Sequence, residues 1–367
     1  MPLWGLTLPA LSVLRPSILG RLRLGPGGGT LVSMPAVRPA PSFSFGVARK
    51  HATPLTRASL LAAGLTVVEA GHFAPRGGRY DVRPLRRRPV RALRGGPDGM
   101  VAAFDVRGGE VEITILATDP LSSAADVAWA MTTARAMIAI DDDPTAFLAI
   151  AGRHPLVAAL AERFDCRLVR TPTVFEAFLR AVIEQLVTTF EATAAIRRLH
   201  GIAGARVVGS RLRAAPVPEA VLAVPPWKLH AIGIGSRRSR TLREGARRGA
   251  ALERLREVDP SLAVKRLQTL PGVGPWTANL VACAALGWAD AVPVGDLHAH
   301  YVVTEALTGT QGDDDAMLEV LAPFRPHRAR VVDLIMKGQG SGAIAGLERI
   351  RRPLPRIDPH RREPWKY

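Results

Sequence analysis

Asp296 is the side chain in this sequence with the clearest capacity for chemistry. It stands in the string VPVGDLHAHYVV, twenty residues after Trp276 and just before a segment with helical periodicity. An aspartate at that place is a good helix N-cap, and in an arbitrary protein this alone would explain it. The helix dipole there also stabilises an ionised carboxylate, the form that can stabilise a positively charged sugar during bond cleavage. The two roles are compatible, so Asp296 is a candidate for both.

A tight turn precedes this aspartate. The segment Gln268–Asn279 reads QTLPGVGPWTAN, in which one predicted helix ends at Leu270 and the next begins near Trp276. Two glycines, two residues apart, allow a sharp turn whose backbone N–H groups point outward at a helix N-terminus. Such groups bind phosphate without reading bases. Between two amphipathic helices in a basic chain, the pattern indicates a helix-hairpin-helix motif.

The charge balance points to the same kind of partner. The 367 residues hold 49 Lys and Arg against 32 Asp and Glu, a net charge of +17, which suits a polyanion such as nucleic acid. The 47% hydrophobic content excludes disorder of the whole chain. No run of 18 apolar residues occurs, so no transmembrane helix is expected. Two cysteines, Cys166 and Cys283, are too few for a disulfide framework or an iron–sulfur cluster, and a reduced, cytoplasmic setting fits.

Composition divides the chain into four parts. Residues 1–68 contain no Asp or Glu and many helix breakers, so we expect a poorly ordered leader. A transit peptide and a mis-assigned start, with Met34 or a later codon as the true start, are two explanations of it. Residues 69–170 are expected to form an N-terminal α+β domain, residues 171–345 a helical domain, and residues 346–367 a basic, Pro-rich tail.

The predicted α+β domain contains two recognisable strands. Val101–Val106 and Glu110–Ala117 alternate or run apolar, with Gly108–Gly109 between them as a hairpin turn. Before them, the stretch from Arg76 to Arg94 holds eight arginines in nineteen residues, which fits either a phosphate-contacting face or a solvated edge strand. Two helices are expected to follow, at Ala124–Ile140 and Pro144–Arg163.

The rest of the chain is predicted to be helical. Thr173 and Glu176 form a capping box that opens a helix whose apolar residues keep the helical period as far as Val187. Three glycines are expected to end later helices: Gly287, Gly309 and Gly338. These later helices are predicted at Pro218–Leu222, Arg237–Gly249, Ser261–Leu270, Trp276–Leu286, Leu297–Leu307 and Arg328–Lys337.

Together these motifs resemble those of one known group of enzymes. The turn LPGVGPWTAN, a Gly/Pro loop and VPVGD follow one another as in the helix-hairpin-helix–Gly/Pro–Asp superfamily of DNA base-excision glycosylases. The segments FEAFLRAVIEQLVTTFEATAAIRRL, PEAVLAVPPWKLHAIGIGSRRSRTLREGAR and PFRPHRARVVDLIM resemble helices of its DNA-3-methyladenine glycosylase II, or AlkA, type. The resemblance covers about Thr171 to Gly338. It implies a mainly α, two-lobed helical helix-hairpin-helix DNA glycosylase fold, preceded by an N-terminal α+β unit.

The resemblance also implies roles for single residues. Asp296 takes the place of the catalytic aspartate, and Leu186, after Gln185, that of an apolar wedge filling the gap left by a flipped base. Trp276 falls on an aromatic wall of the base pocket. For Leu186 and Trp276 the alternative is a place in the helix core. The expected base pocket comprises Trp276, Leu280, Leu297, Gln185 and Met336. Phosphates are expected at Gly272, Val273, Gly274 and Thr277, and a structural Na⁺ or K⁺ at the carbonyls of Gln268, Leu270 and Val273.

The sequence departs from this family pattern at several positions. Bifunctional relatives carry a lysine after the hairpin that attacks the sugar, but here that place holds Trp276, and no lysine lies between Lys265 and Lys337. Leucines replace two expected aromatic residues, a methionine replaces a tryptophan, and a glycine replaces a second acid: Leu280, Leu297, Met336 and Gly295. Aromatic side chains in a base pocket bind cationic bases. These departures therefore leave undecided which damaged bases are recognised, but they do not change the expected catalytic scheme.

Three histidines, His298, His300 and His327, invite a metal-site hypothesis. His298 and His300 are two residues apart on a predicted helix and therefore do not face each other. We expect no catalytic metal here.

The sequence therefore predicts a monofunctional DNA glycosylase, without AP-lyase activity, that hydrolyses the N-glycosidic bond of alkylated purines of the 3-methyladenine and 7-methylguanine type. The alternatives are a glycosylase for an oxidised or deaminated base, and a non-catalytic helix-hairpin-helix DNA-binding protein. The expected partner is double-stranded DNA with damaged bases, with no membrane and no organic cofactor. The expected state is a monomer in the cytoplasm, at the nucleoid, with organelle targeting by the leader as the alternative.

Overall fold

The computed structural model describes residues 124–205 and 213–344 throughout and, before them, six strands between residues 20 and 117. The predicted tail at residues 346–367 lies outside the described residues, as does most of the predicted leader. Helices dominate the described chain after residue 124, as the mainly α prediction requires. None of the described helices is long and apolar enough to span a membrane.

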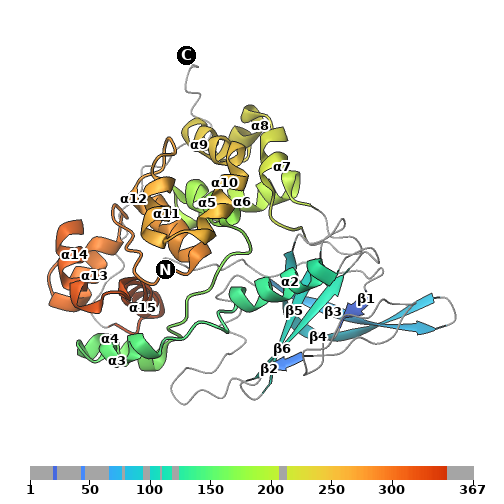
Figure 1. Cartoon of the computed structure of the whole chain (residues 1–367), viewed down its shortest axis with the longest axis horizontal. Coiled ribbons are helices and arrows are strands. Elements are labelled where there is room, and N and C mark those ends of the chain that lie inside the picture. The colour runs from blue at the N-terminus through green and yellow to red at the C-terminus, as the bar shows by residue number, and fades with distance from the viewer. Residues whose placement is uncertain are drawn as a thin grey trace.

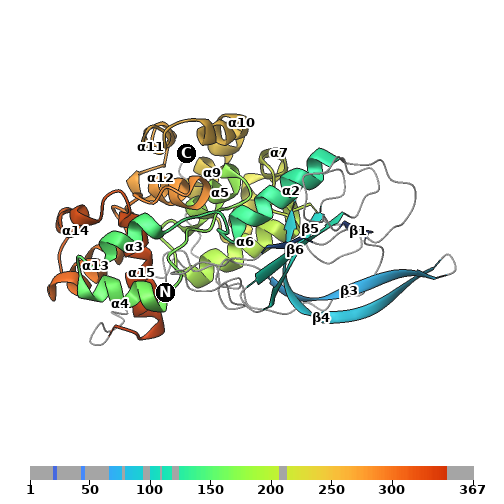
Figure 2. The ribbon, with the colours of Figure 1, turned by 60° about the horizontal axis from the view of Figure 1, so that its bottom comes forward.

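The six strands form one antiparallel sheet (Figure 2): β1 (Gly20–Leu22), β2 (Phe43–Phe45), β3 (Thr66–Arg76), β4 (Arg79–Leu93), β5 (Met100–Arg107) and β6 (Glu110–Ala117). Their order is β1-β6-β5-β4-β3, and β2 also pairs with β6. β5 and β6 form the predicted hairpin, with Arg107 opposite Glu110. β1 and β2 come from the predicted leader, for which no regular structure was expected; β6 offers them free backbone groups to pair with.

β4 carries most of the arginine-rich stretch. In the strand order it lies between β3 and β5. Only its last part, Val90–Leu93, pairs with β5, whereas the preceding part pairs with β3 alone in a two-stranded ribbon. Helix α2 (Ala124–Met137) follows the sheet and lies against β5 and β6 (Figure 1).

The first helical lobe runs without a break in the sequence from residue 174 to residue 286. Helix α5 lies at its centre, and nine of its eleven residues are buried. A helix that is buried on all sides belongs to the interior of a domain. The lobe consists of α5 (Val174–Glu184), α6 (Thr189–Ala203), α7 (Pro218–Ala223), α8 (Pro226–Ala231), α9 (Ser236–Arg247), α10 (Gly249–Glu253), a 3-10 turn (Arg254–Glu257), α11 (Pro260–Leu267), α12 (Pro275–Val281) and a π-helical turn (Ala282–Leu286).

The second helical lobe combines two segments that are far apart in the sequence. Phe147 and Leu160 share a buried core with Val302 and Leu334, and Figure 1 shows α3 and α4 beside the C-terminal helices. The predicted domain boundary at residue 170 groups α3 and α4 with the sheet, whereas their apolar side chains are buried against helices of residues 299–341. The lobe consists of α3 (Thr145–Ala151), α4 (Pro155–Arg163), α13 (Ala299–Thr308), α14 (Asp314–Leu321), a 3-10 turn (Ala322–Phe324) and α15 (Arg328–Ser341).

Most of the predicted helix ends are confirmed. Thr173 caps α5 by accepting a hydrogen bond from the Glu176 amide at 3.0 Å. Gly287 and Gly309 follow helical segments with left-handed φ angles of 70° and 79°, a conformation that favours glycine. These ends fix where the loops that carry the candidate site begin.

The prediction that Gly338 ends a helix is wrong. α15 continues to Ser341, and Gly342, with φ 73°, is its C-cap. Gly338 instead permits close packing, because a Cβ atom there would lie 2.8 Å from Cδ2 of Leu160 in α4. A glycine near a helix end can serve either purpose, and only the packing distinguishes them.

Candidate active site and nucleic-acid interface

The predicted hairpin lies between α11 and α12. Gly272 has a φ of 82°, and a Cβ atom there would lie only 2.1 Å from Oγ1 of Thr241 in α9. Gly274 has an ordinary φ of −94°, and a Cβ atom there would have no neighbouring atom within 4 Å. Gly272 is therefore required by the fold, whereas Gly274 leaves open space in front of the turn.

Backbone donors are available at this turn. The Val273 amide donates to the Leu270 carbonyl at 3.0 Å and closes the turn, and the first bond of α12 runs from the Ala278 amide to the Gly274 carbonyl. The amides of Trp276 and Thr277 precede that bond and have no acceptor within the helix. This is the arrangement of N–H groups that binds anions.

Asp296 lies just before α13, as predicted, and both of its carboxylate oxygens accept hydrogen bonds. Its Oδ1 accepts hydrogen bonds from the amides of His298 and Ala299, at 2.8 and 2.9 Å, and so holds the start of α13, whose N-cap residue is His298. Its Oδ2 accepts one from the indole Nε1 of Trp276 at 2.7 Å. The half-buried carboxylate is thus fixed between the start of α13 and the second helix of the hairpin.

The loop before Asp296 is fixed by the second lobe. Gly295 has a φ of 85°, and its amide donates to Oδ2 of Asp314, the first residue of α14, at 2.9 Å. The Asp296 carbonyl lies 3.0 Å from Nδ1 of His300. Because Trp276 packs against the first lobe, Asp296 is held by both lobes at their junction.

The predicted wedge, Leu186, does not lie in a helix core. α5 ends at Glu184, although apolar residues continue the helical period to Val187. Leu186 has a left-handed φ of 54°, and 78% of its surface is exposed. The core alternative for this residue is therefore wrong, and an exposed leucine with strained backbone is the kind of feature that clusters at functional sites.

Two side chains explain why α5 ends where it does. The Gln185 side-chain amide donates to the Gly272 carbonyl at 3.0 Å and to Oγ1 of Thr277 at 2.9 Å. Arg238 in α9 donates to the Ile183 carbonyl at 2.7 Å and thereby satisfies one of the last carbonyls of the helix. Gln185 thus joins the wedge turn, residues 185–188, to the hairpin.

The other predicted site residues lie in different environments. Leu280 and Met336 are each only 5% exposed and belong to the cores of different lobes, whereas Leu297 is 44% exposed and Trp276 is half-buried. Val273 and Thr277 are buried, so only their backbone groups can meet a phosphate. A common base pocket for these residues stays a prediction.

The histidines of the metal hypothesis are engaged otherwise. Nδ1 of His298 lies 2.5 Å from the Tyr301 hydroxyl, and the rings of His298 and His300 both pack edge-on against Tyr301. Within residues 124–205 and 213–344, no three His, Cys, Asp or Glu side chains are grouped as metal ligands.

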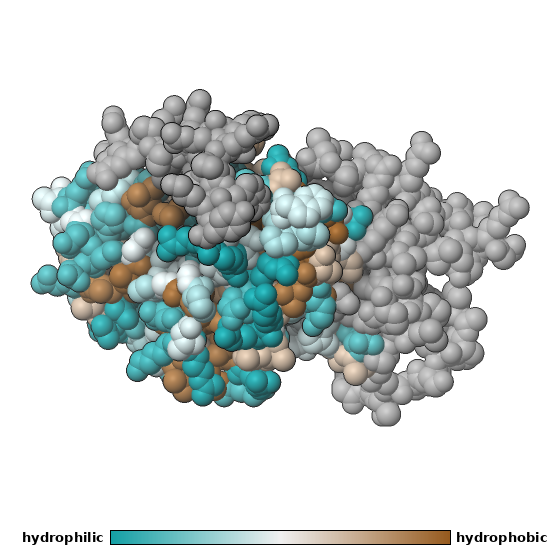
Figure 3. Space-filling view, turned by 90° about the horizontal axis from the view of Figure 1, so that it is seen from above, coloured by the Kyte–Doolittle hydropathy of each residue, from teal (hydrophilic) through white to brown (hydrophobic). Residues whose placement is uncertain are grey.

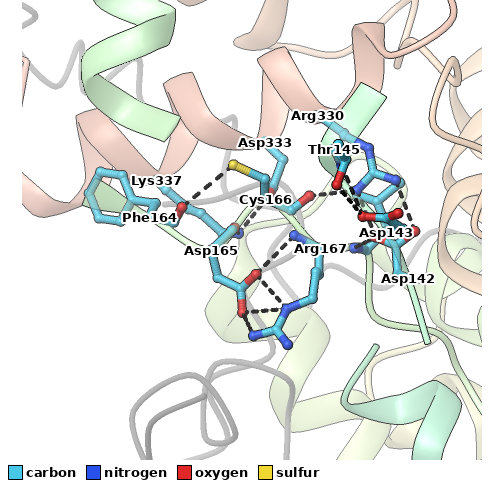
Figure 4. A network of polar contacts seen from close by, with 11 residues as sticks. Asp142, Asp143, Thr145, Phe164, Asp165, Cys166, Arg167, Arg330, Asp333 and Lys337 are labelled. Carbon is cyan, nitrogen blue, oxygen red and sulfur yellow. Dashed lines mark hydrogen bonds and ion pairs between the residues drawn. The ribbon is translucent and has the colours of Figure 1, made fainter. Parts of the chain in front are cut away.

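Lys337 is held in a buried polar network (Figure 4). Its Nζ lies 2.5 Å from Oδ2 of Asp333 and donates to the Asp165 carbonyl at 2.9 Å. Burial alone would lower the pKa of Lys337, but the nearby Asp333 carboxylate outweighs burial and raises it. The amine is therefore held as a cation by its neighbours. Burial also raises the pKa of the Cys166 thiol in this network to about 12, so that cysteine is no nucleophile at neutral pH.

Sequence reasoning missed a basic groove beside the hairpin. Arg237 and Arg240 of α9 are exposed and line it together with Arg247 and Gly272. The sequence signal was the run SRRSRTLREGAR, which holds five arginines and is followed by a sixth. The sequence analysis used this run only as part of the family resemblance.

Figure 3 shows polar side chains over much of the described surface, with apolar ones in separate patches.

Comparison with known proteins finds relatives among DNA repair enzymes. The chain is 31% identical over 212 residues to the probable bifunctional transcriptional activator/DNA repair enzyme AlkA of Mycobacterium tuberculosis, covering 56% of this chain and 41% of the relative. It is 34% identical over 138 residues to DNA-3-methyladenine glycosylase 2 of Escherichia coli, covering 35% and 46%. The chain thus spans under half the length of these two curated relatives. No protein-family profile matches the chain.

The fold has counterparts among solved structures. The 3-methyladenine DNA glycosylase of Archaeoglobus fulgidus superposes with a TM-score of 0.61 at 19% identity, over 70% of this chain and 88% of that one. At such low identity the match speaks for the fold alone. By sequence the chain therefore resembles proteins named AlkA and DNA-3-methyladenine glycosylase 2, and its fold is that of the helix-hairpin-helix DNA glycosylases.

Proposed function

We propose that the protein is a DNA glycosylase that hydrolyses the N-glycosidic bond of alkylated purines of the 3-methyladenine and 7-methylguanine type. The observation that carries this is the 2.7 Å hydrogen bond between Asp296 and Trp276. It joins a carboxylate to the hairpin whose amides suit a phosphate, so DNA held by the turn brings a deoxyribose to the acid. The relatives named above support the substrate class.

The chemistry needs little more than this carboxylate. Alkylation at N3 or N7 makes the base a cationic leaving group, so no strong general acid is required. As the bond breaks, positive charge develops on the sugar, and Asp296 stabilises it and orients or deprotonates the attacking water. The amides that fix Oδ1 and the indole that fixes Oδ2 pre-orient the carboxylate before the substrate arrives. The products are a free base and an abasic site.

Incubation of the full chain with methylated duplex DNA tests the proposal, with mass spectrometry of the released bases. Release of 3-methyladenine or 7-methylguanine supports it. Release only from duplexes that carry 8-oxoguanine, uracil or hypoxanthine would establish the oxidised- or deaminated-base alternative instead. Duplex binding without release of any base would indicate a non-catalytic DNA-binding protein.

Several finer features belong to the same proposal. The partner is double-stranded DNA that contacts the hairpin amides and the basic groove, and the protein acts as a monomer. The sheet with α2 forms the N-terminal α+β domain. A structural Na⁺ or K⁺ fits the hairpin, because the Leu270 carbonyl accepts one hydrogen bond, from Val273, and keeps a second lone pair; the carbonyls of Gln268 and Val273 would complete the set.

Replacing Leu186 separates its backbone from its side chain. We expect Leu186→Ala and Leu186→Gly to lower excision at least about tenfold, because neither fills the gap whose opening costs a few kcal/mol. Leu186→Gly should nevertheless unfold at a higher temperature than Leu186→Ala, because glycine relieves a left-handed strain of about 1 kcal/mol. Thermal melts and single-turnover excision on one methylated duplex check both. Equal excision by the wild-type protein and both variants would show that Leu186 does not fill the gap in the DNA.

The enzyme is expected to leave an intact abasic strand. Strand cleavage by β-elimination needs an amine that attacks C1′, and the family's lysine position holds Trp276. Of the two lysines nearest in sequence, Lys337 is ion-paired to Asp333 and Lys265 lies on α11, before the hairpin. End-labelled methylated duplex should therefore show breaks only after hot alkali, and borohydride should trap no adduct. Nicking without alkali would reveal an attacking amine.

A further inference from the structure

Phe190 is the most exposed of the large hydrophobic residues described. It stands in the first turn of α6, with 84% of its surface exposed, four residues after Leu186. A phenylalanine loses favourable burial when it faces water, and its neighbour Leu186 is exposed to nearly the same degree. Two large, exposed apolar side chains only four residues apart make this part of the surface a candidate binding site.

The turn that presents Phe190 is fixed on both sides. On the helix side, Thr188 and Glu191 form a complete capping box: the Glu191 amide donates to Oγ1 of Thr188 at 3.2 Å, and the Thr188 amide donates to Oε2 of Glu191 at 2.9 Å. On the hairpin side, Gln185 is bound to Gly272. An ordered turn presents Phe190 at little entropic cost on binding.

The residues of this turn carry no cation for the DNA backbone, and the nearby Arg238 donates to the Ile183 and Gly233 carbonyls. No Lys or Arg lies between Arg180 and Arg197, although the whole chain carries a net charge of +17. The hydrogen bonds from Thr188 also lower the pKa of Glu191, so a negative charge stays beside Phe190. The exposed apolar side chains suit the faces of bases, which are apolar and uncharged. Stacking of a base on an aromatic side chain is sequence-tolerant.

We propose that Phe190 stacks on the base opposite the lesion, the base left without a partner when the damaged nucleotide is flipped out. This inference rests on the proposed function. Leu186 fills the gap in the damaged strand, and Gln185, on one side of Leu186 in the chain, contacts the hairpin that holds that strand. In this proposal Phe190, four residues beyond Leu186 at the start of α6, reaches the complementary strand. The ring makes the opposite base part of substrate recognition.

A duplex with an abasic site opposite 2-aminopurine tests this without requiring excision. Stacking on Phe190 should quench the fluorescence of 2-aminopurine when the wild-type protein binds. Phe190→Ala should abolish most of the quenching and weaken binding to this duplex about fivefold or more, the range for loss of one base–aromatic stack. Phe190→Leu keeps an apolar side chain without a ring and should behave like Phe190→Ala in fluorescence. Ile202→Ala, at the other end of α6 and 39% exposed, is the matched control.

The possible results separate the two proposals. If the wild-type protein quenches the probe but releases no alkylated base, the proposed function fails and the stacking role stands. If Phe190→Ala binds and quenches like wild type, the stacking role is overturned, whatever the activity. Quenching that depends on Phe190 only when 2-aminopurine lies beside the abasic site, in the same strand, also overturns it. Because Phe190 is exposed, the melting temperature of each variant should match that of wild type.

Discussion

Asp296→Asn is expected to slow release of alkylated bases about a hundredfold or more while the affinity for lesion-containing duplex changes little. The substitution keeps the size of the side chain but removes the negative charge that stabilises the developing sugar cation. Loss of one such electrostatic interaction costs roughly 3 kcal/mol or more in the transition state. Single-turnover excision and equilibrium binding on the same methylated duplex measure the two quantities.

The structure adds a consequence for the stability of this variant. Every hydrogen bond to the Asp296 carboxylate is donated to it, by two amides on Oδ1 and by the Trp276 indole on Oδ2. An asparagine has only one side-chain oxygen, so its NH₂ group must face a donor. We therefore expect Asp296→Asn to lose about 1 kcal/mol of stability, the usual cost of an unmade hydrogen bond.

Trp276→Phe in the Asp296→Asn background provides the control. It removes the indole donor, so the double variant should regain melting temperature relative to Asp296→Asn, and it should not regain excision. This pattern would show that the rate loss comes from the missing charge and not from a disturbed loop. Near-normal excision by Asp296→Asn would reduce Asp296 to the helix cap that its sequence position also suggested.

Gly272→Ala should be among the most destabilising single changes in the helical lobes. The new Cβ atom would meet Oγ1 of Thr241 at 2.1 Å while the backbone stays at φ 82°. Left-handed strain of about 1–2 kcal/mol and overpacking of about 1–3 kcal/mol act together. The hairpin should deform, and affinity for undamaged duplex should fall with it. Chemical denaturation and binding at fixed salt measure both effects.

Gly274→Ala is the matched change in the same turn. Its φ is −94° and no atom lies near the new methyl group, so the free energy of unfolding should stay within about 0.5 kcal/mol of wild type. DNA affinity should still fall, because the methyl group stands in front of amides that approach a phosphate. If Gly274→Ala bound DNA like wild type, the phosphate contact would have to lie elsewhere than at this turn.

Local features of the fold could be predicted from the sequence. The hairpin between two helices, the cap at Thr173 and the position of Asp296 before a helix follow from turn glycines, a capping threonine and an aspartate at fixed spacing. Each depends on residues that are neighbours in the chain. Asp296 can contact both the start of α13 and the hairpin because one carboxylate has two oxygens, and each accepts from one of the two; its catalytic role stays a prediction.

Features that depend on distant contacts could not be predicted. The apolar period of α5 runs on to Val187, but Gln185 and Arg238 end the helix through contacts 87 and 55 residues away. The contact of Gly338 with Leu160 likewise joins α15 to α4, and nothing local distinguishes such a glycine from a cap. The wedge turn and the second lobe are therefore results of tertiary packing.

The threading of the chain through the two lobes sets an order of assembly. The first lobe is one uninterrupted stretch, and it contains the hairpin and the wedge turn. The second lobe begins with α3 and α4 but lacks most of its core until α13 to α15 have been synthesised. Asp296 lies in the segment that leads from the first lobe back into the second lobe. The amide of Gly295, beside it, is hydrogen bonded to Asp314 of α14. On the ribosome, where domains fold as they emerge, the hairpin and the wedge turn are therefore complete before Asp296 reaches its place.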